Sequence, residues 1–185
     1  MQRIVVQPAG IGAAGLADLK QWLGISQTAE DALLADLLGT ALDLCEAFTG
    51  QAPLAQTIEV LLPPNPGRHE LDTRPVREVL AVEMIAPDQS HTALAEADYT
   101  AEIAADGTAH LRLLTIQPGR ALTVRLSVGI AADWASLPPA LRQGIIRLAA
   151  HGYRDRDRDG AGLRVSTPPA SVIALWQPWR LMRLV

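Results

Sequence analysis

Residues 28–50 read TAEDALLADLLGTALDLCEAFTG and predict one long amphipathic helix. Its apolar positions recur every three or four residues and form one stripe: Leu33, Leu34, Leu37, Leu38, Ala41, Leu42, Cys45 and Phe48. Polar side chains occupy the opposite side: Asp36, Thr40, Asp43 and Glu46. Thr28 and Asp31, three residues apart, weakly resemble a capping box at the start of the helix. The helix is expected to end at Gly50. Such a helix needs a partner that covers its apolar stripe.

Two further segments have helical periodicity. Residues 16–24 read LADLKQWLG, with leucines at helical spacing, and Gly24 can end this helix in the left-handed region. Another helix is expected after Leu137-Pro138-Pro139, because proline is favoured in the first turn of a helix, and its apolar stripe runs through Tyr153. Residues 154–162, RDRDRDGAG, are expected to form a polar loop.

The segment between the helices has the alternation of β-strands. Residues 122–128, LTVRLSV, alternate apolar and polar side chains, as in a sheet with one buried and one solvated face. Further strands are expected at residues 57–62, 76–85, 99–103 and 110–114. Asp106-Gly107 lies between the last two, and this pair favours a tight hairpin turn because it tolerates positive φ. The sequence therefore predicts a small, mostly antiparallel β-lobe.

The order of these elements predicts the α+β class: a small helical bundle interrupted by the β-lobe, with an extended C-terminal tail. We expect residues 1–55 and 134–167 to form the helical core, residues 56–133 to form the β-lobe, and residues 168–185 to form the tail. The helices at 28–49 and 138–153 should pack against each other, although the β-lobe separates them in sequence.

The composition is that of an ordinary globular protein, 49% hydrophobic and 19% charged, with a net charge of −4. Residues 1–135 carry 8 Lys/Arg and 17 Asp/Glu, whereas residues 136–185 carry 8 Arg and 3 Asp. Opposite charges suit docking, because complementary patches steer association and fix its register; a chance partition of surface charge is the alternative. No apolar run approaches the ~20 residues of a membrane span. Without a secretory signal, the protein is expected to be made and folded in the cytoplasm.

No set of residues indicates catalysis, a cofactor or a metal, so we expect none. The four histidines are scattered, Cys45 lies on an apolar helical stripe, and no GxSxG or P-loop motif occurs. Residues 155–160, DRDRDG, match the first half of a calcium-binding loop. The twelfth position, however, is Ser166 where glutamate is required, and the interleaved arginines oppose a cation. The acidic second helix would also be repelled by DNA phosphates, which argues against a recognition helix.

Three segments of the chain carry a family resemblance. The first combines LADLK (16–20), WLGI (22–25), EDALL (30–34) and EAFTG (46–50); the second combines LPPALRQGI (137–145) and LAAHGYR (148–154); the third is PASVIALWQPWR (169–180). In this order around a β-lobe, they resemble the phage head-tail connector (adaptor) family, in the subset that carries a β insertion. Trp179 stands where tyrosine is commoner in the family, and the Asp/Arg loop is longer.

The resemblance implies a structural, non-enzymatic subunit that forms a ring, a dodecamer in the particle, between the capsid portal and the tail. The implied partners are the portal protein, a tail-side stopper or terminator protein, and other copies of the chain, with DNA passing non-specifically through the ring. Such rings occur in long-tailed phages and in gene transfer agents. The protein would then lie in the neck of a virion or phage-like particle assembled in the bacterial cytoplasm.

The C-terminal tail is the expected docking element. By analogy to the family, a groove of the portal would bind Trp176, Trp179, Arg180, Leu181 and Arg183, and large aromatics with arginine are typical of interface hot spots. The alternative is that the tail folds back and covers the core of its own subunit. Two other functions stay open: a tail-completion or terminator protein on the tail side of the neck, and a small cytoplasmic enzyme with an unconventional site.

Overall fold

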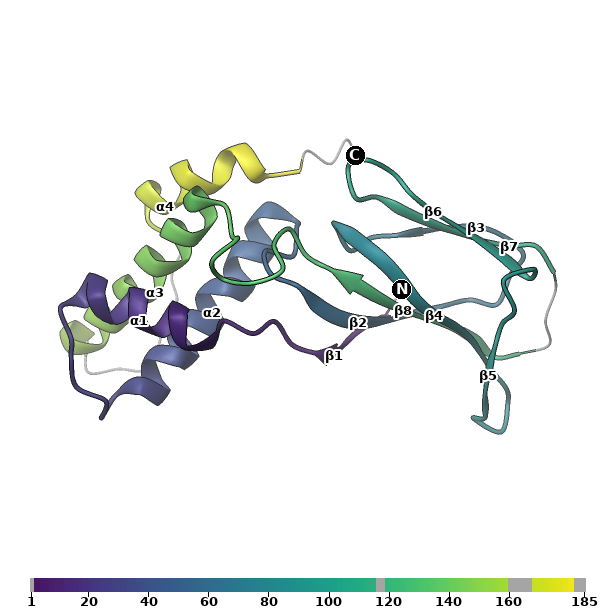
Figure 1. Cartoon of the computed structure of the whole chain (residues 1–185), viewed down its shortest axis with the longest axis horizontal. Coiled ribbons are helices and arrows are strands. Elements are labelled where there is room, and N and C mark those ends of the chain that lie inside the picture. The colour runs from purple at the N-terminus through teal and green to yellow at the C-terminus, as the bar shows by residue number, and fades with distance from the viewer. Residues whose placement is uncertain (1, 116–118, 160–167, 182–185) are drawn as a thin grey trace. The chain divides into compact units, whose positions relative to one another are not determined.

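The computed structural model describes residues 2–115, 119–159 and 168–181, and the chain divides into two compact units (Figure 1). One unit contains Met1–Ala9 and Ala55–Gly129, and the other contains Gly10–Leu54 and Ile130–Val185. The described strands all lie in the first unit and the described helices in the second, which gives the α+β class. We call them the β-unit and the helical unit.

The β-unit contains two antiparallel sheets. The larger has the order β1-β2-β8-β4-β5 and comprises β1 (Gln2–Gln7), β2 (Gln56–Leu62), β8 (Ala121–Val128), β4 (Val76–Ile85) and β5 (His91–Ala93). The smaller has the order β3-β7-β6 and comprises β3 (Gly67–Leu71), β7 (Ala109–Leu113) and β6 (Tyr99–Ile103). The alternating run at 122–128 becomes the central strand β8, since β2 and β4 pair with it on its two sides.

The core of the β-unit lies between its two sheets. β2 and β8 are in continuous register, so that Ile58, Val60 and Leu62 share one face with the alternating apolar residues of β8. These side chains are buried, as are Leu71 and Leu111 of the smaller sheet. Figure 1 shows the smaller sheet lying alongside the larger one, and β4 contacts β6. Each sheet thus buries one face, as expected for antiparallel sheets.

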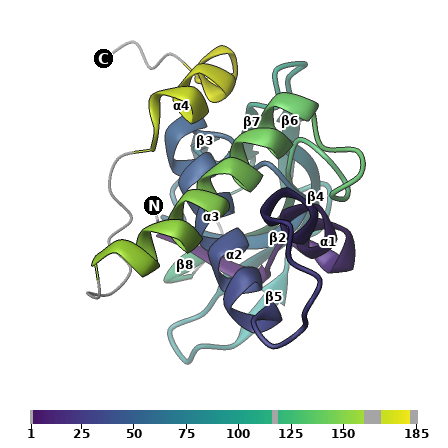
Figure 2. The same ribbon diagram turned by 90° about the vertical axis from the view of Figure 1, so that its left-hand side faces the viewer.

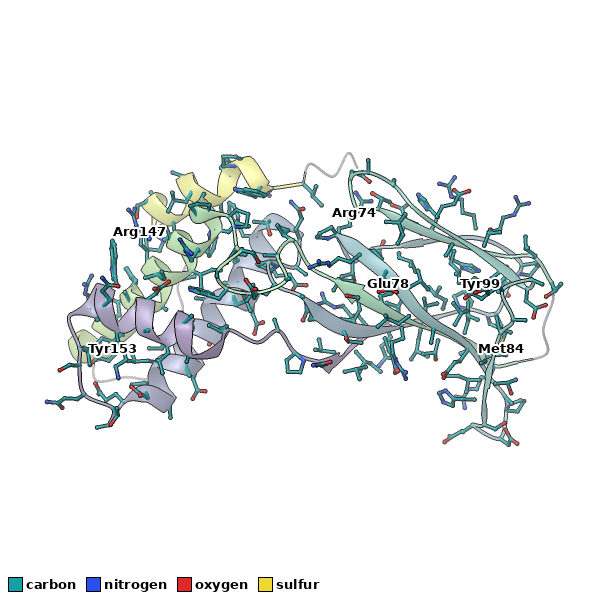
Figure 3. All side chains as sticks on the ribbon, in the orientation of Figure 1. Arg74, Glu78, Met84, Tyr99, Arg147 and Tyr153 are labelled. Atoms are coloured by element: carbon teal, nitrogen blue, oxygen red, sulfur yellow. The ribbon has the colours of Figure 1, made fainter. Side chains whose placement is uncertain are left out.

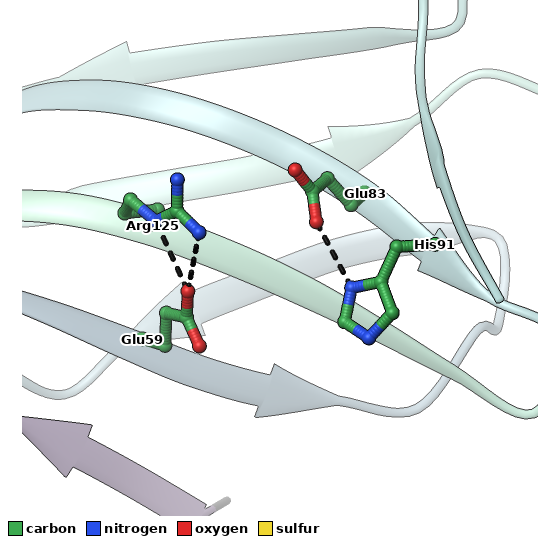
Figure 4. Close-up of polar contacts among 4 residues, drawn as sticks. All are labelled: Glu59, Glu83, His91 and Arg125. Carbon is green, nitrogen blue, oxygen red and sulfur yellow. Dashed lines mark hydrogen bonds and ion pairs between the residues drawn. The ribbon is translucent and has the colours of Figure 1, made fainter. Parts of the chain in front are cut away.

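The opposite face of the larger sheet carries cross-strand ion pairs (Figure 4). Arg125 of β8 donates from Nε and Nη2 to Glu59 Oε1 of β2, at 3.0 and 2.7 Å. These hydrogen bonds raise the pKa of Arg125 above its ordinary value. His91 Nδ1 lies 3.0 Å from Glu83 Oε2, across β5 and β4. Solvent-exposed pairs of this kind contribute little stability, but pairs across neighbouring strands favour one register over another.

In the helical unit, α2 (Asp31–Thr49) packs against α3 (Pro139–Asp159), and α1 (Gly12–Leu23) contacts both (Figure 2). Leu37 of α2 and Ile145 of α3 are 5% and 0% exposed. Gly152 allows close approach, because a Cβ added there would lie 3.2 Å from Leu37 Cδ2. Tyr153, labelled in Figure 3, donates its hydroxyl to Glu30 Oε2 at 2.5 Å. The expected packing of the two helices is therefore confirmed.

α3 extends past its predicted end. Residues 154–159 continue the helix where we expected a loop, and His151 Nδ1 lies 3.0 Å from Asp155 Oδ2, one turn later. The reason is local: no glycine or proline occurs between Tyr153 and Gly160, and nothing else interrupts the propagating helix. A calcium loop brings its ligands at positions 1, 3 and 5 to one ion, whereas alternate residues of a helix lie about 200° apart around its axis. The aspartates at 155, 157 and 159 thus lie on a helix and not in an ion-binding loop.

Other differences concern the start of the chain and two short strands. Residues 2–7, which we had placed with the helical core, form β1 and pair with β2. Residues 12–15 already belong to α1, so this helix begins four residues before its predicted start. The strands β3 and β5 were not predicted, because they have five and three residues and are mainly polar. Pairing with β7 and β4 determines these two strands, and their own sequences do not.

Truncation of the α2–α3 contact tests this packing. Leu37→Ala and Ile145→Ala should each lower the free energy of unfolding of the helical unit by about 2–5 kcal/mol, because each leaves a cavity in a buried layer. Trp22, Trp134, Trp176 and Trp179 all belong to the helical unit, so tryptophan fluorescence during chemical denaturation reports on that unit. Gln21→Ala, an exposed change on α1, is the control and should have almost no effect.

Candidate functional site

The segment that the sequence singles out for docking folds onto α2 and α3. Residues 170–176 form the helix α4 (Ala170–Trp176), and the 3-10 turn η1 (Gln177–Trp179) follows directly. Pro169 occupies the N-cap position, and α4 buries Val172 and Trp176, four residues apart, on one face. α4 contacts both α3 and α2, and Figure 2 shows it next to α3. Residues 170–179 are therefore helical and packed, and the extended backbone resumes only at Arg180.

Trp176 is the anchor of this segment. Its side chain is 0% exposed, and its ring centroid lies 6.0 Å from that of Phe48 on α2. The indole Nε1 donates to the carbonyl of Leu141 at 3.4 Å. Gly144 makes room for the ring, because a Cβ added at this position would lie 2.1 Å from Trp176 Nε1. Glycine inside a helix costs about 1 kcal/mol relative to alanine, and the seat for the indole explains why it stands here.

The residues after Trp176 cover the C-terminal end of α2. Gln51 Nε2 donates to the carbonyl of Trp179 at 2.6 Å, and the backbone N–H of Leu181 donates to the carbonyl of Thr49 at 3.0 Å. The guanidinium of Arg180 lies 5.5 Å from the ring centroid of Phe48. The last carbonyls of a helix lack intrahelical partners and carry partial negative charge, so a donor and a cation are favourable there.

The five predicted docking residues thus differ in what they can offer a partner. Trp176 fills the core of its own subunit, as the fold-back alternative required, and its indole presents no surface for binding. Trp179 and Leu181 are half-buried, and Arg180 is exposed. Arg183 lies outside the described residues. Among the described residues, the exposed surface of this segment comprises the outer side of η1 and Arg180.

Gly144, Phe48 and Gln51 contact this segment. Phe48 was expected on the apolar stripe of α2, whereas no role was predicted for Gly144 or Gln51. The signal for Gly144 was present, since a glycine inside a helical pattern suggests close approach of another group. Gln51 had no such signal, because its amide binds a backbone carbonyl 128 positions away in sequence.

The described residues show no arrangement typical of a reactive or metal-binding site. No group of three or more His, Cys, Asp or Glu residues among them could hold a metal ion. Burial raises the pKa of the Cys45 thiol to about 12, so at neutral pH this cysteine is a protonated core residue. Within the parts of the chain that the structure describes, no helix combines the length and hydrophobicity that crossing a membrane requires.

No protein-family profile matches the sequence, and no curated protein matches it either. Solved structures of gene transfer agent (GTA) particles do match, over 100% of this chain and 98% of theirs. A chain of the neck of an empty GTA particle, computed with C6 symmetry, has a TM-score of 0.80 at 25% identity. A chain of the native GTA neck, computed with C12 symmetry, has a TM-score of 0.78 at 24% sequence identity. A chain of the native GTA virion has a TM-score of 0.77 at 26% sequence identity. The fold of these chains extends over both units.

The Trp176 seat leads to a prediction with a matched pair of variants. Trp176→Ala should destabilise the helical unit by about 3–5 kcal/mol, because it empties a fully buried site. Trp179→Ala removes the same side chain from a half-buried position and should cost about 1 kcal/mol or less. Chemical denaturation followed by the fluorescence of the three remaining tryptophans measures both. If both variants lost the same free energy of unfolding, Trp176 would not differ from Trp179 as a core residue.

Proposed function

We propose that this protein is a structural subunit of the neck of a gene transfer agent or tailed-phage particle, acting as a connector (adaptor) between the capsid portal and the tail. The observation that carries the proposal is the match of the whole chain to a GTA neck chain, with a TM-score of 0.80 and 25% identity. A match of both units in one alignment supports a common role better than a match of one common domain would. The particle neck is the corresponding location.

Within the neck, the chain forms a homo-oligomeric ring through which DNA passes. The C6 and C12 symmetries of the matching neck structures support a ring. Cyclic rings use heterologous interfaces, in which two different faces of the same subunit meet. The acidic surplus of residues 1–135 suits a passage for DNA, because negative walls do not retain the phosphate backbone.

The exposed side of the C-terminal segment is the proposed portal-docking surface. Arg180, Trp179 and Leu181 lie at its centre, and Arg183 follows them in sequence. The backbone of Trp179 and Leu181 is already fixed on α2 by the hydrogen bonds of Gln51 and Thr49, so binding requires little further ordering of these two residues. Arginine beside aromatic and aliphatic side chains is a common composition of interface hot spots.

The neck role is tested by removing the gene from a strain that produces the particles. We expect the protein in purified wild-type particles by mass spectrometry, and DNA-filled heads without tails in the deletion strain by electron microscopy. Cross-linking in wild-type particles then identifies the neighbour. Cross-links to the portal support the adaptor position, whereas cross-links only to tail proteins would assign the chain to the tail side, as a terminator. Normal tailed particles in the deletion strain would refute the neck role.

The docking surface gives a separate prediction. The double variant Arg180→Glu/Arg183→Glu should fold, because Trp176 stays in its seat, and it should lower the yield of tailed particles at least about tenfold by removing interface cations. Circular dichroism checks folding, and electron microscopy counts the particles. Arg77→Glu, an exposed change in the β-unit, is the control and should leave the yield unchanged. A normal yield from the double variant would argue against docking by this surface.

A further inference from the structure

The end of α1 and the middle of α3 place an exposed indole beside a guanidinium that forms no ion pair with the described residues. Trp22 is 43% exposed, and Arg147 Cζ lies 5.6 Å from its ring centroid. Arg147, labelled in Figure 3, buries its Nε with no hydrogen-bond partner among the described residues. A buried N–H without a partner costs stability, and a guanidinium stacked on a ring can still bind a carboxylate through its edge. This pair has the chemistry of a carboxylate receptor.

The outer side of α2 carries a carboxylate suited to such a receptor. Asp36 is exposed on the side opposite the buried Leu37 and Leu38, and the described residues form no hydrogen bond or ion pair with its carboxylate. The helix positions beside it include Ala32 one turn before, and Gly39 and Thr40 about one turn after. A Cβ added at Gly39 would meet no atom within 4 Å, so the surface beside Asp36 is open. A flat indole could approach the helix closely there.

The charges of the helical unit favour a second copy of the chain as the partner. Residues 10–54 contain one Lys and six Asp/Glu, whereas residues 130–185 contain eight Arg and four Asp. One unit therefore presents an acidic side on α2 and the cationic guanidinium of Arg147, beside Trp22, at α1 and α3. Complementary faces on a single subunit satisfy the head-to-tail contact that a closed ring requires.

We infer that Trp22 and Arg147 of one copy bind the Asp36 side of α2 in the next copy, and that this contact repeats around the ring. The inference rests on the ring of the proposed function and names the surfaces that build it. Arg147 pairs with the carboxylate of Asp36, and Trp22 packs over the small residues beside it. The pairing also gives the guanidinium of Arg147 a counter-charge at its outer edge, while its buried Nε has no hydrogen-bond partner among the described residues.

Charge reversal with mutual rescue tests this pairing. Arg147→Glu and Asp36→Arg should each weaken self-association of the purified chain at least about tenfold, because like charges then face each other. An equimolar mixture of the two variants should regain association to within about threefold of wild type. In a ring that alternates the two variants, every contact joins opposite charges: the native Asp36 meets the native Arg147, and the introduced arginine meets the introduced glutamate. Sedimentation velocity over a concentration series measures association, and thermal melting confirms that each variant is folded.

Arg154→Glu, an exposed reversal on α3, is the matched control and should associate like wild type. Three results would overturn the pairing: a wild-type chain that stays monomeric, a mixture no better than the single variants, or normal association of Asp36→Arg, which is exposed and tolerant of substitution. The neck role is judged separately, by the presence of the chain in particles. Rescue in solution by a chain absent from particles would refute the neck role alone, and a chain present in particles without rescue would refute the pairing alone.

Discussion

The contact between α2 and α3 is the constraint on which the rest of the chain depends. Leu37 and Ile145 lie in one buried layer although the β-unit separates them in sequence. This is possible because the chain enters residues 55–129 and leaves them at adjacent points, and each unit contains a contact between the incoming and the outgoing chain. In the helical unit, Ile130 N–H donates to the carbonyl of Ala52 at 2.9 Å. In the β-unit, Gln56 and Val128 are direct partners on β2 and β8. Residues 55–129 of the β-unit are thus an insertion with adjacent ends, and the start of the chain adds β1 to it.

The C-terminal segment uses the surface that this contact creates. The carbonyl of Leu141 and the gap at Gly144 belong to α3, while Phe48 and Thr49 belong to α2, so only the packed pair offers the complete seat for Trp176. In the proposed role, stability and docking are divided along a short stretch of chain. Trp176 belongs to the core, and Arg180, four residues later, belongs to the surface. The proposed connector presents a docking element whose position the fold has already fixed.

Much of the fold could be predicted from periodicity, because long elements carry a strong signal of their own. α2, β4 and β6 match their predicted ranges closely, and the Asp106-Gly107 turn has positive φ at Gly107 as expected. β1 was missed because residues 2–7 become a strand only through pairing with β2, which lies far away in sequence. The end of α3 was misplaced because alternating Arg and Asp resemble a loop in composition, yet both residues are compatible with a helix.

The candidate site was less accessible to sequence reasoning. Aromatic content drew notice to residues 176–181, but composition does not distinguish a tryptophan that binds a partner from one that fills its own core. That distinction depends on the Gly144 seat, which exists only after α3 has packed on α2. The Trp22–Arg147 pair could not be predicted from the sequence either, because its two residues lie on different helices and meet only after the helices pack.

The adjacent ends of the β-unit also order events during synthesis. As the chain leaves the ribosome, α1 and α2 appear first, with an apolar stripe whose partner is not yet translated. The entropy lost on closing a flexible loop increases with the length of the loop. Once the insertion has folded, however, the pairing of β2 with β8 already holds its two ends close together. Folding of residues 55–129 therefore brings the start of α3 near the end of α2 before α3 packs. Trp176 arrives last, so a ribosome that stops early releases a subunit whose seat is empty and whose core is open.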